Sequence, residues 1–281
     1  MTGYILEAYN NMGDVYTSPR LIEEAKNRDI TLDLIGVRDT LCVERTLYNA
    51  GRKLQQRDFV INRYKWGKML TELNRLGTLS YNELSAFEIY VNKFEQRKRL
   101  SSDAFRKPKY LLGHTSIPYE QLVPHLGSNI VAKGLENSMG REIFLIEKPQ
   151  DMAQLTAYGS REWLFEEFIA ESYGRDLRVY SVRGQAIAAM IRRSQNDFRA
   201  NVALGAKTIP YDIDEKLCRI ATDIYAQTGL DFVGIDLLFG EDDLYLCEIN
   251  VMPGLMGIEQ ATGVNVAGAV METIRGDLCS E

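Results

Sequence analysis

Histidine is scarce in this 281-residue chain, which contains only His114 and His125. Ser-His catalysis or a histidine-rich metal site would have to be built around one of these two residues. The four cysteines are widely spaced, at Cys42, Cys218, Cys247 and Cys279. This spacing favours neither a zinc site nor a disulfide framework, so we expect reduced, non-catalytic thiols in a cytoplasmic protein. The chemistry should therefore rest on carboxylates, amides, lysines and arginines.

Long apolar segments and an excess of positive charge are also missing. No apolar run approaches the ~20 residues of a membrane span, and residues 1–7 lack the charged-then-apolar layout of a signal peptide. The net charge is −6, from 39 acidic and 33 basic side chains, which argues against nucleic acid or an anionic membrane as a partner. The motifs G-x-x-x-x-G-K-[ST] and G-x-G-x-x-G do not occur, so the P-loop and Rossmann modes of nucleotide binding are not supported.

The remaining patterns predict a mixed α/β and α+β protein in three parts. Strands at 4–9, 30–37 and 59–61 alternate with helices over 18–25 and 67–76, which is typical of an α/β unit with parallel strands. We assign this unit to residues 1–90. A central part, 91–165, and a β-rich part, 166–281, follow.

The most basic stretch of the chain covers residues 91–109. Its cations are Lys93, Arg97, Lys98, Arg99, Arg106, Lys107 and Lys109. For most of these residues, the pattern is typical of a solvated helix face followed by a loop.

Two apolar segments near the C-terminus, 232–239 and 244–250, predict a hairpin with carboxylates on one face. Glu248 and Asn250 are two residues apart and so point to the same side. A turn at 241–243 pairs Asp236 with Glu248 and Leu238 with Leu246, which brings Asp236 to that face. Facing carboxylates repel each other unless a hard cation such as Mg²⁺ lies between them. A solvated polar face is the alternative.

The next residues, Asn250-Val251-Met252-Pro253-Gly254, turn the strand sharply. With this N-x-x-P-G turn, the hairpin resembles the ATP-grasp ligases, most closely the RimK-like carboxylate–amine ligases. The resemblance runs from Asn92-Lys93 and Lys133 to the end of the last helix, about residues 91–275. It implies an N-terminal pre-ATP-grasp domain at 1–90 and two α+β subdomains, 91–165 and 166–281, that hold ATP between them.

The resemblance also implies roles for individual residues. Asp236, Glu248 and Asn250 match the Mg²⁺ ligands of the family, with two ions expected and Mn²⁺ able to substitute. Lys93 and Lys133 match its phosphate-contacting lysines, and Arg199 and Asn201 its triphosphate contacts with a catalytic role. The alternative for the lysines is an ordinary surface position.

The remaining implied contacts concern the nucleotide and the acyl-phosphate. The hinge beside adenine matches Glu166, Glu167, Phe168 and Ile169. Asp176 matches a ribose contact, although a plain salt bridge with Arg178 is the alternative. Of the adjacent Arg192 and Arg193, only one can face the cleft, and the resemblance favours Arg193 near the acyl-phosphate.

One loop departs from the family pattern. The family has a small-residue loop with two or three glycines over the phosphates, whereas residues 136–142 read Glu-Asn-Ser-Met-Gly-Arg-Glu. Bulky residues hinder close approach of a backbone to an anion. Either Ser138 and Gly140 therefore suffice for the backbone contacts with phosphate, or loop closure and reaction rate differ from those of relatives.

The implied function is an ATP- and Mg²⁺-dependent ligase. It would join a carboxylate to an amine of an amino acid, peptide or protein through an acyl-phosphate and release ADP and phosphate. Two alternatives use the same reaction or site: a ligase that forms lactam or ester rings in a ribosomal peptide, and a phosphotransferase that stops at the phosphorylated acceptor. A third alternative is a nucleotide-binding module without turnover. Because relatives often assemble, the resemblance also allows a homo-oligomer.

Overall fold

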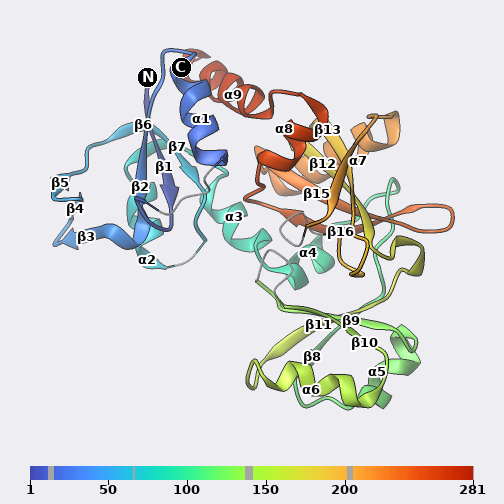
Figure 1. The fold of residues 1–281 in the computed structure, drawn as a ribbon. Helices are drawn as coiled ribbons and strands as arrows, with labels where there is room; N and C mark the ends of the chain where they lie inside the picture. The colour runs from blue at the N-terminus through green and yellow to red at the C-terminus, as the bar shows by residue number, and fades with distance from the viewer. Residues whose placement is uncertain (12–15, 66, 137–141, 201–204, 281) are drawn as a thin grey trace.

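The computed structural model describes residues 1–11, 16–65, 67–136, 142–200 and 205–280. Three sheets with their helices make up the molecule, together with a small three-stranded sheet that projects at the left of Figure 1. In the described residues, no helix is both long enough and apolar enough to cross a membrane.

The N-terminal sheet has the strand order β2-β1-β6-β7, and all its neighbouring strands are parallel. Its central strands are almost entirely buried, as expected for strands covered on both faces. The elements of this region are β1 (Thr2–Glu7), α1 (Thr17–Lys26), β2 (Thr31–Gly36), η1 (Val37–Asp39), β6 (Arg57–Asn62), α2 (Lys68–Asn74) and β7 (Gly77–Tyr81).

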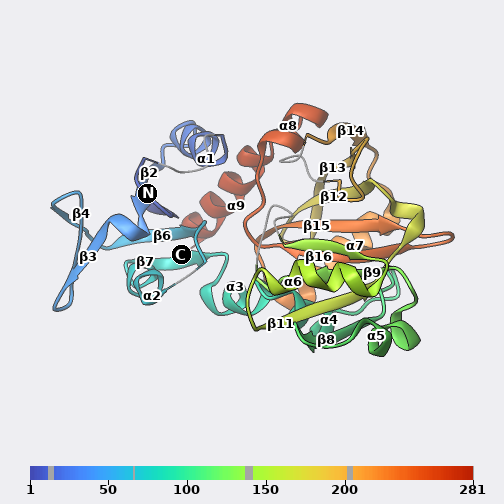
Figure 2. The same ribbon diagram turned by 60° about the horizontal axis from the view of Figure 1, so that its bottom comes forward.

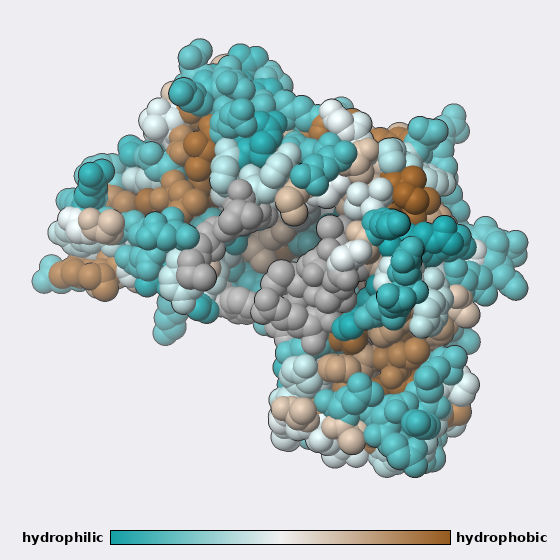
Figure 3. All heavy atoms as spheres, viewed as in Figure 1, coloured by the Kyte–Doolittle hydropathy of each residue, from teal (hydrophilic) through white to brown (hydrophobic). Residues whose placement is uncertain are grey.

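The projecting sheet lies between β2 and β6 in the chain. It consists of β3 (Thr40–Val43), β4 (Thr46–Asn49) and β5 (Arg52–Lys53). Its edge strand β3 exposes 67% of Leu41 and 56% of Val43, and hydrophobic spheres appear at this edge of the molecule (Figure 3).

The central sheet has the order β10-β9-β11-β8 with antiparallel neighbours. Its apolar core includes Leu122, Ile130, Trp163 and Phe165 and lies between the sheet and helices α5 and α6. Its elements are β8 (Tyr110–His114), α5 (Tyr119–Leu126), β9 (Ile130–Lys133), β10 (Ile143–Ile146), η2 (Pro149–Met152), α6 (Ala153–Thr156) and β11 (Glu162–Glu167).

The C-terminal sheet is antiparallel, in the order β14-β13-β12-β15-β16. Figure 2 shows it beside the central sheet, with the long helix α9 leading back to the N-terminal part. Its elements are η3 (Ala170–Ser172), β12 (Arg175–Val182), β13 (Gln185–Arg193), β14 (Lys207–Tyr211), α7 (Glu215–Thr228), β15 (Phe232–Phe239), β16 (Leu244–Asn250), α8 (Met256–Thr262) and α9 (Val266–Ser280).

Two apolar cores cover the two faces of the C-terminal sheet. One contains α7 and residues of α3 (Leu84–Tyr90) and is extended by Leu100 and Phe105, which follow α4 (Lys93–Arg99). The other joins β12 and β13 to α1, α9 and the N-terminal strands β1 and β6. The N-terminal and C-terminal sheets therefore share a core, whereas the central sheet has its own.

Candidate active site

A cavity of about 670 Å³ is lined by residues of the central, C-terminal and N-terminal sheets. It collects most of the residues predicted from the sequence. Those on its walls are Lys133, Glu166, Glu167, Phe168, Ile169, Asp176, Arg199, Asp236, Glu248 and Asn250. Ser138, Gly140 and Asn201 lie outside the described residues.

The hairpin β15–β16 supplies the three predicted metal ligands. Asp236 lies opposite Glu248, which confirms that predicted pairing, and Gly234 lies opposite Asn250. The predicted pairing of Leu238 with Leu246 is wrong, because Leu246 lies opposite Leu237. A bulge between these pairs leaves Cys247 as the extra residue of β16, so Cys247 and Glu248 both reach the cavity although they are consecutive.

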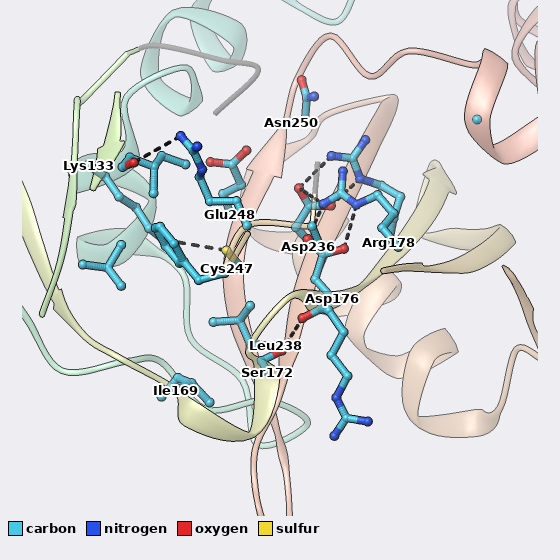
Figure 4. Close-up of a pocket in the computed structure, with 18 of the residues that line it drawn as sticks. Lys133, Ile169, Ser172, Asp176, Arg178, Asp236, Leu238, Cys247, Glu248 and Asn250 are labelled. Atoms are coloured by element: carbon cyan, nitrogen blue, oxygen red, sulfur yellow. Dashed lines mark hydrogen bonds and ion pairs between the residues drawn. The ribbon is translucent and has the colours of Figure 1, made fainter. Parts of the chain in front are cut away.

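Asp236 lies in a buried network with two arginines (Figure 4). Arg178 donates through Nε to Oδ1 and through Nη2 to Oδ2 at 2.7 Å, and Arg192 Nη2 lies 3.0 Å from Oδ2. Burial raises the pKa of Asp236, but attraction to Arg178 and Arg192 outweighs burial and lowers it overall. The carboxylate is therefore held in its charged form.

The same network holds Asp176. Both of its carboxylate oxygens accept hydrogen bonds from Arg192, at 2.6 and 2.7 Å. Burial, and repulsion from Asp236, raise its pKa against the attraction of the arginines. The alternative, a salt bridge between Asp176 and Arg178, does not form in the structure. Arg192 pairs with Asp176 and Arg178 pairs with Asp236.

The structure corrects the choice between the adjacent arginines of β13. Arg192 is buried and lines the cavity, whereas Arg193 is exposed and is not among the cavity residues. Neighbouring strand residues point to opposite faces, and the pairing of Arg192 with Asp176 across the sheet turns Arg192 inward. Of the two arginines, Arg192 and not Arg193 therefore faces the cavity.

A second buried network lies on the central-sheet side of the cavity. Glu166 forms an ion pair with Lys133, 2.6 Å from Oε2 to Nζ, and a shorter one with Arg97. Arg97 also donates to the Cys247 carbonyl. Burial raises the pKa of Glu166, but attraction to Arg97 and Lys133 lowers it overall. Arg97 and Glu166 are each 1% exposed, and Lys133 is 4% exposed.

These contacts change two expectations. Lys133 and Lys93 are buried, which contradicts the alternative of ordinary surface lysines. The expected solvated face of residues 91–109 holds for Lys98, Arg99, Arg106 and Lys109, which are exposed. It is wrong for Arg97, which bridges the central and C-terminal sheets.

Lysines also gather beside Glu248. Lys93 Nζ lies 3.4 Å from Glu248 Oε2. Lys65, in the loop after β6, lies near the same carboxylate and donates to the Glu136 carbonyl. Burial and repulsion from Lys93 lower the pKa of Lys65 to about 8. No motif singles out Lys65, because only the fold brings the N-terminal sheet to this position.

Cys247 offers a direct check of the site's burial. Burial raises the pKa of its thiol to about 11, whereas Cys42, Cys218 and Cys279 are exposed. Because the thiolate is the reactive form, we expect three cysteines to react quickly with a disulfide reagent at pH 8 and Cys247 to react slowly. Peptide mapping of the labelled protein identifies the sites, with the urea-unfolded chain as control. Fast labelling of Cys247 in the folded protein would contradict this burial.

The apolar end of the cavity is formed by the segment after β11, with Phe168, Ile169 and Leu238. The Glu167 carboxylate accepts from the Lys109 N–H at 2.8 Å, and the Phe168 N–H donates to the Asn129 carbonyl at 3.2 Å. The Ile169 N–H has no partner in the described parts of the chain. A flat apolar ligand at this end of the cavity would therefore find one backbone donor, the Ile169 N–H.

Arg199 lies at the mouth of the cavity. Its guanidinium binds the Asp197 carboxylate, with Nη2 2.6 Å from Oδ2. It also donates to the Ile143 carbonyl at 3.4 Å. Arg199 thus contacts both the C-terminal region and the central sheet.

The donor set of the hairpin fits a hard cation. Asp236, Glu248 and Asn250 present only oxygen ligands, which suit Mg²⁺ together with substrate phosphates. No cluster of three or more His, Cys, Asp or Glu placed for a metal occurs among the described residues, so the protein alone offers two carboxylates and one amide. A cation at Asp236 would replace the positive charge that Arg178 and Arg192 supply there.

Comparison with known proteins identifies the family. The model of the RimK-like ATP-grasp domain matches residues 91–274. A curated relative, "Probable alpha-L-glutamate ligase" of Haemophilus influenzae, is 30% identical over 202 residues, covering 70% of this chain and 67% of the relative.

Two solved structures share the fold. The ATP-grasp ligase PsnB complexed with minimal precursor has a TM-score of 0.72 at 16% identity and covers 98% of both chains; it has also been solved with Mg and ADP. The macrocyclase MdnC of Microcystis aeruginosa MRC, bound with precursor peptide MdnA, has a TM-score of 0.70 at 15% identity and covers 97% of this chain and 99% of that one. With the family match, this likeness confirms the predicted ATP-grasp fold. The chain belongs to the RimK-like ATP-grasp family and is an ATP-dependent ligase.

Proposed function

We propose that this protein joins a carboxylate to an amine, with ATP and Mg²⁺, through an acyl-phosphate. The ATP γ-phosphate is transferred to the carboxylate and ADP leaves. The amine then attacks the acyl carbon, the C–N bond forms, the C–O bond to phosphate breaks, and an amide and inorganic phosphate result. The observation that carries the proposal is one cavity lined by Asp236, Glu248, Asn250 and Lys133, with Lys93 Nζ 3.4 Å from the Glu248 carboxylate.

Phosphoryl transfer depends mainly on positioning and charge neutralisation. Mg²⁺ held by Asp236, Glu248 and Asn250 would neutralise charge on the β- and γ-phosphates. Lys133 lines the cavity and Lys93 pairs with Glu248 at its edge, which supports a role for both lysines as contacts of the phosphate oxygens. The presence of two ions, and replacement by Mn²⁺, stay predictions.

The adenine would lie at the apolar end. Phe168, Ile169 and Leu238 supply its hydrophobic walls, and the Ile169 N–H is a donor toward a ring nitrogen. The Glu166 side chain binds Lys133 and Arg97 instead, so Glu166 acts through the position of Lys133 rather than on the base. We assign the ribose to Asp176, which lines the cavity; its carboxylate oxygens accept hydrogen bonds from Arg192.

The relatives indicate which substrates to test first. The name of the Haemophilus relative makes L-glutamate the first amine to test. PsnB and MdnC were solved with precursor peptides, which supports a ring-forming ligase as the second candidate. The division at residues 90/91 and 165/166, a cytoplasmic location and a homo-oligomeric state stay predictions.

ADP release should require Mg²⁺, a carboxylate and an amine together. We expect it when the protein is incubated with ATP, Mg²⁺, a pool of peptides with free carboxyl termini and L-glutamate, and mass spectrometry should show a peptide that has gained one amino-acid residue. Loss of one water from a peptide would favour the ring-forming candidate. ADP release that needs the peptide but no amine would identify a phosphotransferase, and no ADP release under any condition would contradict the proposal.

A further inference from the structure

The cavity continues past the hairpin to the N-terminal sheet, where Glu7 and Arg63 line it. Glu7 ends β1, and Arg63 follows β6, which is the parallel neighbour of β1. The chain leaves β1 for β2 on one side and later returns to β6 on the other, so the strand order reverses here. Crevices at the carboxyl ends of strands beside such a reversal are the usual ligand sites of open parallel sheets.

The Glu7 carboxylate is only 6% exposed and its two oxygens differ. Oε1 accepts from Arg63 Nε at 2.9 Å and from the Ser18 hydroxyl. Oε2 has no partner in the part of the chain that the structure describes. Because Glu7 lines the cavity, this oxygen can accept a hydrogen bond from the donor of a ligand bound there.

This carboxylate lies close to the end of the metal-binding strand. Arg63 Nη1 donates to the Pro253 carbonyl at 3.3 Å, and the Tyr180 hydroxyl donates to the same carbonyl at 2.9 Å. Pro253 is in the turn that follows Asn250. Glu7 thus belongs to the N-terminal side of the cavity, whereas Phe168 and Ile169, at its apolar end, follow a strand of the central sheet (Figure 1).

We propose that Glu7 Oε2 accepts a hydrogen bond from the amino group of the amine substrate, a primary amine of an amino acid. This inference rests on the proposed ligase function. The Glu7 carboxylate attracts the N–H donor of the amine substrate and repels the carboxylate substrate. It therefore distinguishes the two substrates. The lysines and arginines around Asp236 and Glu248 suit the phosphates and the acid, which leaves the amine for the N-terminal side.

Glu7→Gln tests the inference, because it keeps the shape and removes the charge. Hydroxylamine, at saturating concentration, traps an acyl-phosphate as a hydroxamate without the natural amine. The twenty standard amino acids are screened one by one with wild type, ATP, Mg²⁺ and the peptide pool, and the fastest is carried forward. Loss of one charge-assisted hydrogen bond should raise the KM for that amino acid about 10- to 100-fold. Hydroxamate formation and the KM for ATP should stay within about twofold of wild type.

Glu72→Gln is the matched control, since Glu72 is on α2 of the same region and pairs with Arg75 on the surface. It should leave the KM for the amino acid, the KM for ATP and hydroxamate formation unchanged. Melting temperatures of both variants detect a loss of fold, and a purely structural role for Glu7 would lower hydroxamate formation as well. An unchanged KM for the amino acid in Glu7→Gln would overturn the inference. It would also be overturned if wild type formed hydroxamate but accepted none of the twenty amino acids as the amine substrate. Wild type that forms no hydroxamate would overturn the ligase proposal itself.

Discussion

Replacing Glu248 by alanine should lower the rate of ADP release by at least about 100-fold. The variant loses an oxygen ligand opposite Asp236 and leaves Lys93 without the carboxylate that lies 3.4 Å from its Nζ. The Glu248 side chain is partly exposed at the cavity and is outside the apolar cores. The fold should therefore persist, with a melting temperature close to that of wild type.

Glu241→Ala is the matched control, because Glu241 is exposed in the turn of the same hairpin. It should turn over at the wild-type rate. Titration with Mg²⁺ gives a second readout: Glu248→Ala should need a higher concentration for any remaining activity. Wild-type activity in Glu248→Ala at low Mg²⁺ would rule out this residue as a metal ligand.

Arg97→Ala should destabilise the protein by about 3–5 kcal/mol, the usual effect of removing one partner from a buried ion pair. Arg97 is fully enclosed and contacts both Glu166 and the Cys247 carbonyl. Without it, a buried carboxylate retains only Lys133, and a backbone carbonyl loses its donor. Urea unfolding, followed by circular dichroism, measures the difference in the free energy of unfolding.

Arg99→Ala provides the comparison on the same helix. Arg99 is exposed and pairs with Glu95 one turn away, so its removal should leave the free energy of unfolding near the wild-type value. Equal losses in the two variants would show that the Arg97 network contributes nothing beyond an ordinary surface pair. Arg97→Ala should also weaken ATP binding, because Glu166 then draws Lys133 away from the phosphates.

The hairpin was predictable because its information is local. Alternation places Glu248 and Asn250 on one face, and a short turn brings Asp236 opposite Glu248. The bulge was not predictable from alternation, since it is a single extra residue, Cys247, in an otherwise regular strand.

Residues defined by long-range contacts could not be found in this way. Arg97 lies in a run of cations, and only the packing of α4 between two sheets shows that it is buried. Glu7 and Lys65 carry no motif. The pairing of β1 with β6 brings Glu7 to the cavity, and the loop after β6 brings Lys65 to the neighbouring pocket beside Glu248. The strands β3 to β5 are only two to four residues long, which explains why no pattern indicated them.

The separate core of the central sheet has a mechanical consequence. Trp163, Phe165 and their neighbours pack only with each other, while the N-terminal and C-terminal sheets share one interior through α1 and α9. The N-terminal and C-terminal sheets thus form one larger unit and the central sheet a smaller one. The Arg97–Glu166 ion pair joins the two units. We therefore expect ATP binding to move the central sheet, which carries Lys133, relative to the hairpin that carries Asp236 and Glu248.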